Sequence, residues 1–103
     1  MTKQQAYQIM IELYQWEHDN PFKDYDQSPV FKKYKINKMR AHCAIAAFHE
    51  GCEECPASID PRFFGCLPLT AIQFDCRFLK DEKRYKRICN IFINVFKMEV
   101  NNV

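Results

Sequence analysis

Glycine is nearly absent from this chain of 103 residues, which contains only Gly51 and Gly65. All-β domains with many tight turns usually need several residues that tolerate a positive φ angle, and glycine adopts such angles most readily. A turn-rich sheet protein is therefore disfavoured. The scarcity of glycine favours helix before any periodicity is considered.

Long apolar segments are also missing. The longest uninterrupted apolar run covers residues 43–48, which is far too short to cross a bilayer, and residues 1–5 lack the apolar stretch of a secretion signal. We therefore expect a soluble, intracellular protein of the cytoplasm without a membrane partner. In that reducing compartment the six cysteines are expected to be thiols or metal ligands, although their even number would suit disulfides in an exported protein.

The sequence has no recognisable catalytic motif. It contains no Ser-His-Asp order, no phosphate-binding glycine loop and no paired-carboxylate motif. The His49-Glu50 pair does not continue into a zinc-hydrolase motif, because Glu53 stands where the second histidine is required. We therefore expect that the protein is not an enzyme. The remaining catalytic alternative is a site in which His18, His42 or His49 meets carboxylates brought close by folding.

Apolar side chains recur at helical spacing through most of the chain. Thr2 and Gln5 form a capping-box pattern at the start of the first such segment, and Asn20-Pro21 ends it. Ser28-Pro29 is typical of a second helix start. The pattern predicts helices over residues 3–18 and 29–36, a third from Asn37 to Gly51, a fourth from Pro68 to Leu79, and a terminal helix through residues 85–96.

These helices predict an all-α fold in the form of a compact bundle of about five helices. Since 48% of the residues are apolar and the length suits one core, we expect a single helical domain spanning residues 1–103. Residues 39–48 are almost entirely apolar or small, which predicts a buried central helix. In the fourth helix, Ile72, Cys76 and Leu79 share one face that is expected to pack inward, and small buried thiols are also expected at Cys43 and Cys89.

Histidine and cysteine are concentrated between residues 42 and 66. His49, Cys52, Cys55 and Cys66 are residue types that tetrahedral zinc prefers, and the C-x-x-C pair can present two thiolates to one ion, with His42 as a substitute ligand. A single C-x-x-C pair is a weaker pattern than two such pairs, and free cysteines are often simply buried. We therefore expect no cofactor, and a zinc or iron-sulfur site at these four residues is the first alternative.

Basic residues form two groups along the chain. The net charge is only +2, so attraction to nucleic acid would have to come from local clustering. Around Tyr34 stand Lys32, Lys33, Lys35, Lys38 and Arg40, and around Tyr85 stand Arg77, Lys80, Lys83, Arg84, Lys86 and Arg87. If adjacent, the cations could follow a phosphate backbone while the tyrosines stack on bases. Because charge runs on helices are usually solvated surfaces, nucleic-acid binding is the second alternative.

A folded core, separated charges and the lack of a catalytic motif together indicate binding. The acidic residues at positions 24, 26, 50, 53 and 54 are separate from the basic groups, which suits docking onto a charged protein. We expect a small regulatory or inhibitory protein that binds a larger macromolecular partner, chiefly another protein. The many Lys, Asn, Ile, Phe and Tyr residues suit an AT-rich coding sequence and hence a phage or mobile-element origin. The pattern predicts no particular oligomeric state.

Overall fold

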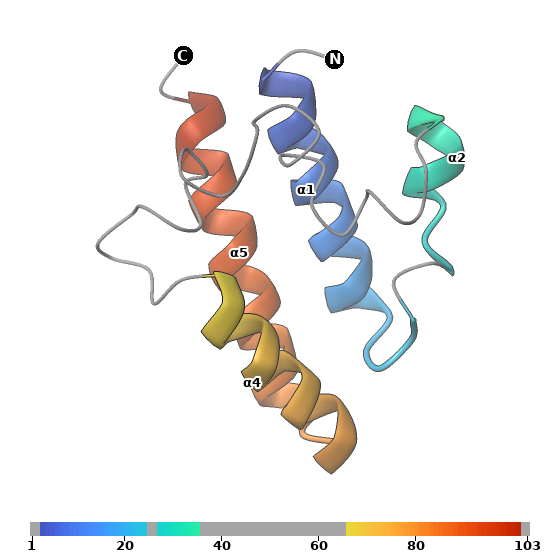
Figure 1. The fold of residues 1–103 in the computed structure, drawn as a ribbon, viewed down its shortest axis with the longest axis vertical. Coiled ribbons are helices and arrows are strands. Elements are labelled where there is room, and N and C mark those ends of the chain that lie inside the picture. Colours follow the sequence, from blue (N-terminus) through green and yellow to red (C-terminus); the bar gives the residue numbers. More distant parts are fainter. Residues whose placement is uncertain (1–2, 25–26, 36–65, 102–103) are drawn as a thin grey trace.

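The computed structural model describes residues 3–24, 27–35 and 66–101 (Figure 1). Over these residues it contains four helices, α1 (Lys3–Asp19), α2 (Val30–Tyr34), α4 (Cys66–Leu79) and α5 (Glu82–Asn101), and no strand. The all-α prediction is confirmed for this part of the chain. The predicted central helix at residues 39–48 lies outside the described residues, so the five-helix arrangement remains a prediction.

Helices α1 and α5 run antiparallel and pack against each other along their length (Figure 1). Their contact is dominated by aromatic rings: Tyr14 stacks on Phe92 with ring centroids 4.3 Å apart and an angle of 2° between the rings. One turn further along α5, and two turns back along α1, Tyr7 lies 5.9 Å from Phe96, again between ring centroids. These residues are almost completely buried. The predicted 3.6-residue repeats of the first and terminal helices therefore form the centre of the described core.

Helix α2 packs against α1 on the side away from α5 (Figure 1). Val30 and Phe31 are buried, and the backbone N–H of Val30 donates to Ser28 Oγ over 3.3 Å. On the solvent side, Glu12 of α1 accepts hydrogen bonds from Lys33 Nζ and Tyr34 Oη. The helix is shorter than the predicted 29–36, because Lys35 adopts a left-handed conformation with φ 54° and ends it.

Helices α4 and α5 are joined by a two-residue turn in which lysine takes a position usually held by glycine. Lys80 has φ 58°, the Asp81 N–H donates to the Cys76 carbonyl over 2.9 Å, and the Lys80 N–H donates to the Arg77 carbonyl over 3.4 Å. This is the Schellman pattern of helix ends. Asp81 then caps α5, since its Oδ1 accepts from the Arg84 N–H over 3.2 Å. Residues 80–84, which lie between the two predicted helices, are thus mostly the first turn of α5.

The loop after α1 is fastened to this turn. Phe22 has φ 69°, an unusual conformation for a bulky residue, and its ring packs 5.2 Å from that of Tyr85, centroid to centroid. Lys80 Nζ lies 5.2 Å from the centre of the Phe22 ring, and Asp24 forms an ion pair with Arg77. The end of α1 is therefore held beside the α4–α5 turn by aromatic and charged contacts.

We predict that Lys80→Gly gives a more stable protein than Lys80→Ala. A left-handed conformation costs a side-chain-bearing residue about 1–2 kcal/mol, part of which is offset by the greater freedom of glycine in the unfolded chain. The expected gain over Lys80→Ala is about 1 kcal/mol in the free energy of unfolding, measured by urea denaturation. Lys80→Ala is the matched control, because both variants lose the contact with Phe22. Equal stability of the two variants would contradict a left-handed Lys80.

Candidate functional site

The predicted metal ligands are mostly beyond the described part of the chain. His42, His49, Cys52 and Cys55 lie outside it, and Cys66 is the first residue of α4. Among the residues that the structure describes, no group of three or more His, Cys, Asp or Glu side chains is arranged to hold a metal ion. The zinc and iron-sulfur hypothesis therefore stays a prediction. Cys76 and Cys89 are buried free thiols, as expected from their apolar faces.

The described basic residues do not form one group. Lys32, Lys33 and Lys35 lie on or just after α2, whereas the cations of residues 77–87 surround the α4–α5 turn, far from α2 along the long axis in Figure 1. Lys38 and Arg40 lie outside the described residues. Lys33 pairs with Glu12, Arg77 with Asp24, and Lys86 with Glu82 over 3.5 Å.

Neither tyrosine of the basic groups is placed as the nucleic-acid hypothesis expects. Tyr85 is almost fully buried between α5 and the loop that carries Phe22, so its ring cannot stack on a base. Tyr34 is half-buried and its hydroxyl donates to Glu12. Burial and this hydrogen bond raise the pKa of Tyr34, the hydrogen bond having the larger effect. Both tyrosines thus serve packing between helices.

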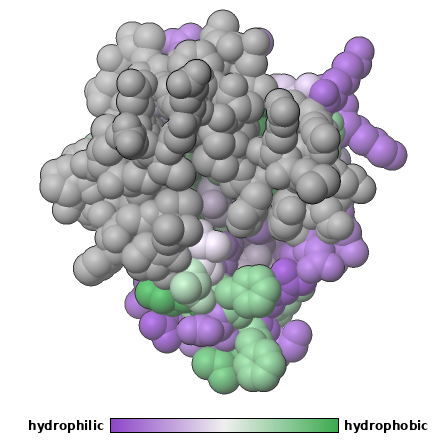
Figure 2. All heavy atoms as spheres, viewed as in Figure 1, coloured by the Kyte–Doolittle hydropathy of each residue, from purple (hydrophilic) through white to green (hydrophobic). Residues whose placement is uncertain are grey.

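Helix α4 buries one polar side chain, Gln73, and exposes two aromatic side chains. Gln73 and Cys76 are buried, with 6% and 1% of their surface exposed, whereas Phe74 is 69% and Phe78 85% exposed. Leu79, which we expected on the core-facing side, is 69% exposed, so that prediction was wrong. Figure 2 shows hydrophobic side chains gathered on the surface at this end of the molecule. We call Phe74 and Phe78, which share one face of α4, the α4 patch.

Unpaired cations follow the α4 patch in the chain. Lys80, Lys83 and Arg84 are exposed and, among the described residues, form no ion pair with an acid. Asp81 is used as the cap of α5, and Asp75 is an exposed acid on α4 itself. Cations therefore outnumber acids over residues 75–87, with six of the former and three of the latter. The segment that contains and follows the α4 patch therefore carries a net positive charge.

Beneath the α4 patch lies a polar cluster between α1, α4 and α5. Gln73 Nε2 donates to Cys89 Sγ over 3.4 Å, and Gln73 also hydrogen-bonds the carboxylate of Glu17. Glu17 is only 5% exposed, and its Oε2 atom has no hydrogen-bond partner. Burial raises the pKa of Glu17 to about 7, although Gln73 and the charge of Arg77 act in the opposite direction. Burial, with the charge of Glu17, likewise raises the pKa of the Cys89 thiol to about 12.

We predict that Glu17 makes the stability of the protein depend on pH. Its folded-state pKa of about 7 lies above the ordinary value of 4.5, so the stabilising contribution is fully present below about pH 4.5 and is lost as pH rises to 7. Glu17→Gln should remove this slope and raise the free energy of unfolding at pH 8 by up to about 3 kcal/mol. Urea denaturation between pH 5 and pH 8, at about 0.5-unit steps, measures both effects.

Asp75→Asn is the control for this pH series, because Asp75 is an exposed acid on α4. It should keep the slope of the unmodified protein. An unchanged slope in Glu17→Gln would show that the Glu17 carboxylate is not held in a dry environment.

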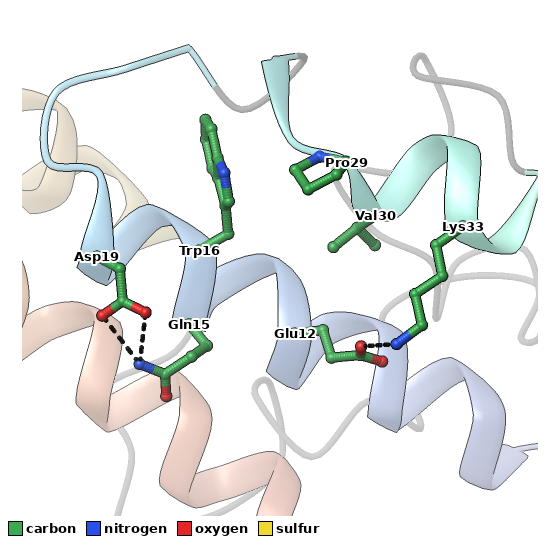
Figure 3. Close-up of a pocket in the computed structure, with 7 residues that line it drawn as sticks. All are labelled: Glu12, Gln15, Trp16, Asp19, Pro29, Val30 and Lys33. Carbon is green, nitrogen blue, oxygen red and sulfur yellow. Dashed lines mark hydrogen bonds and ion pairs between the residues drawn. The ribbon is translucent and has the colours of Figure 1, made fainter.

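A second candidate site is a shallow groove of about 340 Å³ between α1 and α2 (Figure 3). Its apolar surface comes from Trp16, Pro29 and Val30, and its polar atoms come from Glu12, Gln15, Asp19 and Lys33. Because Glu12, Gln15, Trp16 and Asp19 are three or four residues apart, they share one face of α1. The groove thus combines an aromatic ring with carboxylates.

Comparisons with known proteins give no family for this chain. A scan against protein-family models found no match, and comparisons with curated proteins and with solved structures found no significant match. The functional reading therefore rests on the surfaces just described. None of the described helices is long and apolar enough to span a membrane.

Sequence reasoning missed the residues that distinguish both surfaces. Phe74 and Phe78 are four residues apart, so a helical projection places them together, opposite Ile72 and Cys76. This second apolar face was the available signal for the α4 patch. For the groove, no comparable signal exists, because Trp16 and Pro29 come from elements whose packing the spacing does not predict.

Proposed function

We propose that this protein is a small regulatory or inhibitory protein that binds a larger protein through the α4 patch. The observation that carries the proposal is the inverted polarity of α4, in which the polar Gln73 is buried while the apolar Phe74 and Phe78 are exposed. Burying one phenylalanine side chain is worth about 1.5–3 kcal/mol, so a surface that leaves two of them in water has a large free energy available for binding. Clustered exposed apolar residues commonly mark interaction sites.

The charge beside the patch indicates the chemistry of the partner. Lys80, Lys83 and Arg84 are exposed next to the patch in the chain and pair with no acid among the described residues. A complementary surface would carry apolar side chains flanked by Asp or Glu. We therefore propose an acidic, apolar segment of a larger protein as the occupant. By covering such a segment, a small protein can block or redirect its partner, which is the action of a regulator or inhibitor.

We predict that the purified protein selects acid-flanked apolar sequences from a displayed library of random peptides. Aromatic or aliphatic residues should be enriched together with Asp and Glu, because they match the patch and its cations. The double variant Phe74→Ser/Phe78→Ser should lose this enrichment. Affinity of the selected peptides, measured by calorimetry, should fall at least about tenfold in the double variant, which corresponds to about 1.4 kcal/mol.

Met98→Ser is the matched control, because Met98 is another exposed apolar residue, on α5. It should select the same peptides as the unmodified protein. Circular dichroism should show equal helix content in all three proteins, since the replaced side chains are exposed. Selection of basic peptides, or equal binding by the double variant, would refute the proposal. Preferential binding of single-stranded oligonucleotides over the selected peptides would assign the patch to nucleic acid instead.

A further inference from the structure

The groove between α1 and α2 has a composition suited to a long cationic side chain. Trp16, Pro29 and Val30 provide the apolar surface, and carboxylates stand on the α1 side (Figure 3). An arginine side chain has the same two parts, an aliphatic stem and a charged planar head. Its guanidinium group can also lie on the face of a tryptophan ring.

Of the two carboxylates, Glu12 is already occupied. It accepts hydrogen bonds from Lys33 Nζ and Tyr34 Oη, which fasten α2 to α1. Burial raises the pKa of Glu12, but these hydrogen bonds outweigh burial and hold the pKa below its ordinary value. Glu12 therefore maintains the groove and is not free to bind a further cation.

Asp19 is the more exposed of the two carboxylates, although its Oδ2 atom also accepts from Gln15 Nε2, over 3.4 Å. Its side chain is 59% exposed and accepts from Gln15 Nε2 over 3.2 Å, while the ring nitrogen Nδ1 of His18 lies 3.0 Å from Oδ1. These hydrogen bonds, that of His18 first, hold the pKa of Asp19 below its ordinary value, so it is ionised at neutral pH. The charge of Lys86 on α5 also lowers this pKa, but within the described part of the chain no lysine or arginine lies within ion-pair distance of Asp19.

The position of Asp19 in α1 strengthens its assignment as a binding group. Asp19 is the last residue of the helix, where the carbonyl ends of the helix disfavour a negative charge. The hydrogen bond from Gln15, four residues earlier, offsets part of this cost by supporting the helix. A bound cation would compensate the unfavourable charge.

We propose that the α1–α2 groove binds an arginine side chain of a partner protein, with the stem against Trp16 and Pro29 and the guanidinium group hydrogen-bonded to Asp19. This inference goes beyond the α4 patch, because it concerns another surface and a ligand of opposite charge. A carboxylate offers about four acceptor positions, so Asp19 can accept from a guanidinium group while keeping Gln15.

The chain provides a direct readout, because Trp16 is its only tryptophan. Intrinsic fluorescence at physiological salt should change saturably when the tripeptide acetyl-Gly-Arg-Gly-amide is added, with a dissociation constant in the millimolar range. The corresponding glutamate tripeptide should cause no saturable change. The lysine tripeptide should bind more weakly than the arginine tripeptide, because an ammonium group lacks the planar face that stacks on tryptophan.

Asp19→Asn should lower the affinity for the arginine tripeptide about fivefold to tenfold, which is the loss expected for one charge-assisted hydrogen bond. Asp75→Asn, which removes an exposed acid from α4, is the control and should leave the affinity unchanged. The Phe74→Ser/Phe78→Ser variant should also keep full affinity, which separates this site from the α4 patch. Equal responses to the arginine and glutamate tripeptides, or an unchanged affinity in Asp19→Asn, would overturn the proposal.

Discussion

The stacked rings of Tyr14 and Phe92 lie at the centre of the described structure, and the other elements depend on the α1–α5 contact that these rings form. Phe92 and its neighbour Cys89 are completely buried. Because interiors are close-packed, this contact fixes the rotation of both helices about their axes. One face of α1 then receives α2 through Glu12, and the polar cluster of Glu17 meets α4. Both candidate surfaces are consequences of that rotation.

The buried polar cluster and the exposed α4 patch both follow from the way α4 is rotated against α1 and α5. Helix α4 is apolar on two faces, and it packs with the face that contains Gln73, because Gln73 hydrogen-bonds Glu17 and the Cys89 sulfur, although Glu17 Oε2 keeps no partner. Packing Phe74 inward instead would leave the buried Glu17 carboxylate without this partner, at a cost of about 1–3 kcal/mol or more for a charged group. A buried acid on α1 thus keeps two phenylalanines of α4 in water. The packing of the core therefore determines that these two aromatic side chains are exposed.

The sequence predicted the helices in which apolar residues recur on a single face. The bounds of α1 and the existence of α5 follow from a single apolar face in each helix, and Ser28-Pro29 correctly marked the start of α2. The inward face of α4 could not be chosen in this way, because the choice depends on Glu17 and Cys89, which are distant in sequence. The cations at residues 77–87 were predicted as a group that could bind a partner, which stays a prediction. Trp16 and Asp19 were not singled out, since the groove exists only after α2 packs on α1.

A net charge of +2 conceals a separation of charge over short distances. The exposed carboxylate of Asp19 ends α1, and the next few residues lead directly to Phe22 and Asp24, which contact Lys80 and Arg77 beside the α4 patch. One short loop therefore connects Asp19, at the edge of the groove, with residues that contact Lys80 and Arg77. A partner segment that followed this loop would meet carboxylate, aromatic and cationic groups in a fixed order. Two weak contacts linked in this way act at a high effective concentration, so each surface can be modest alone and the combination still selective.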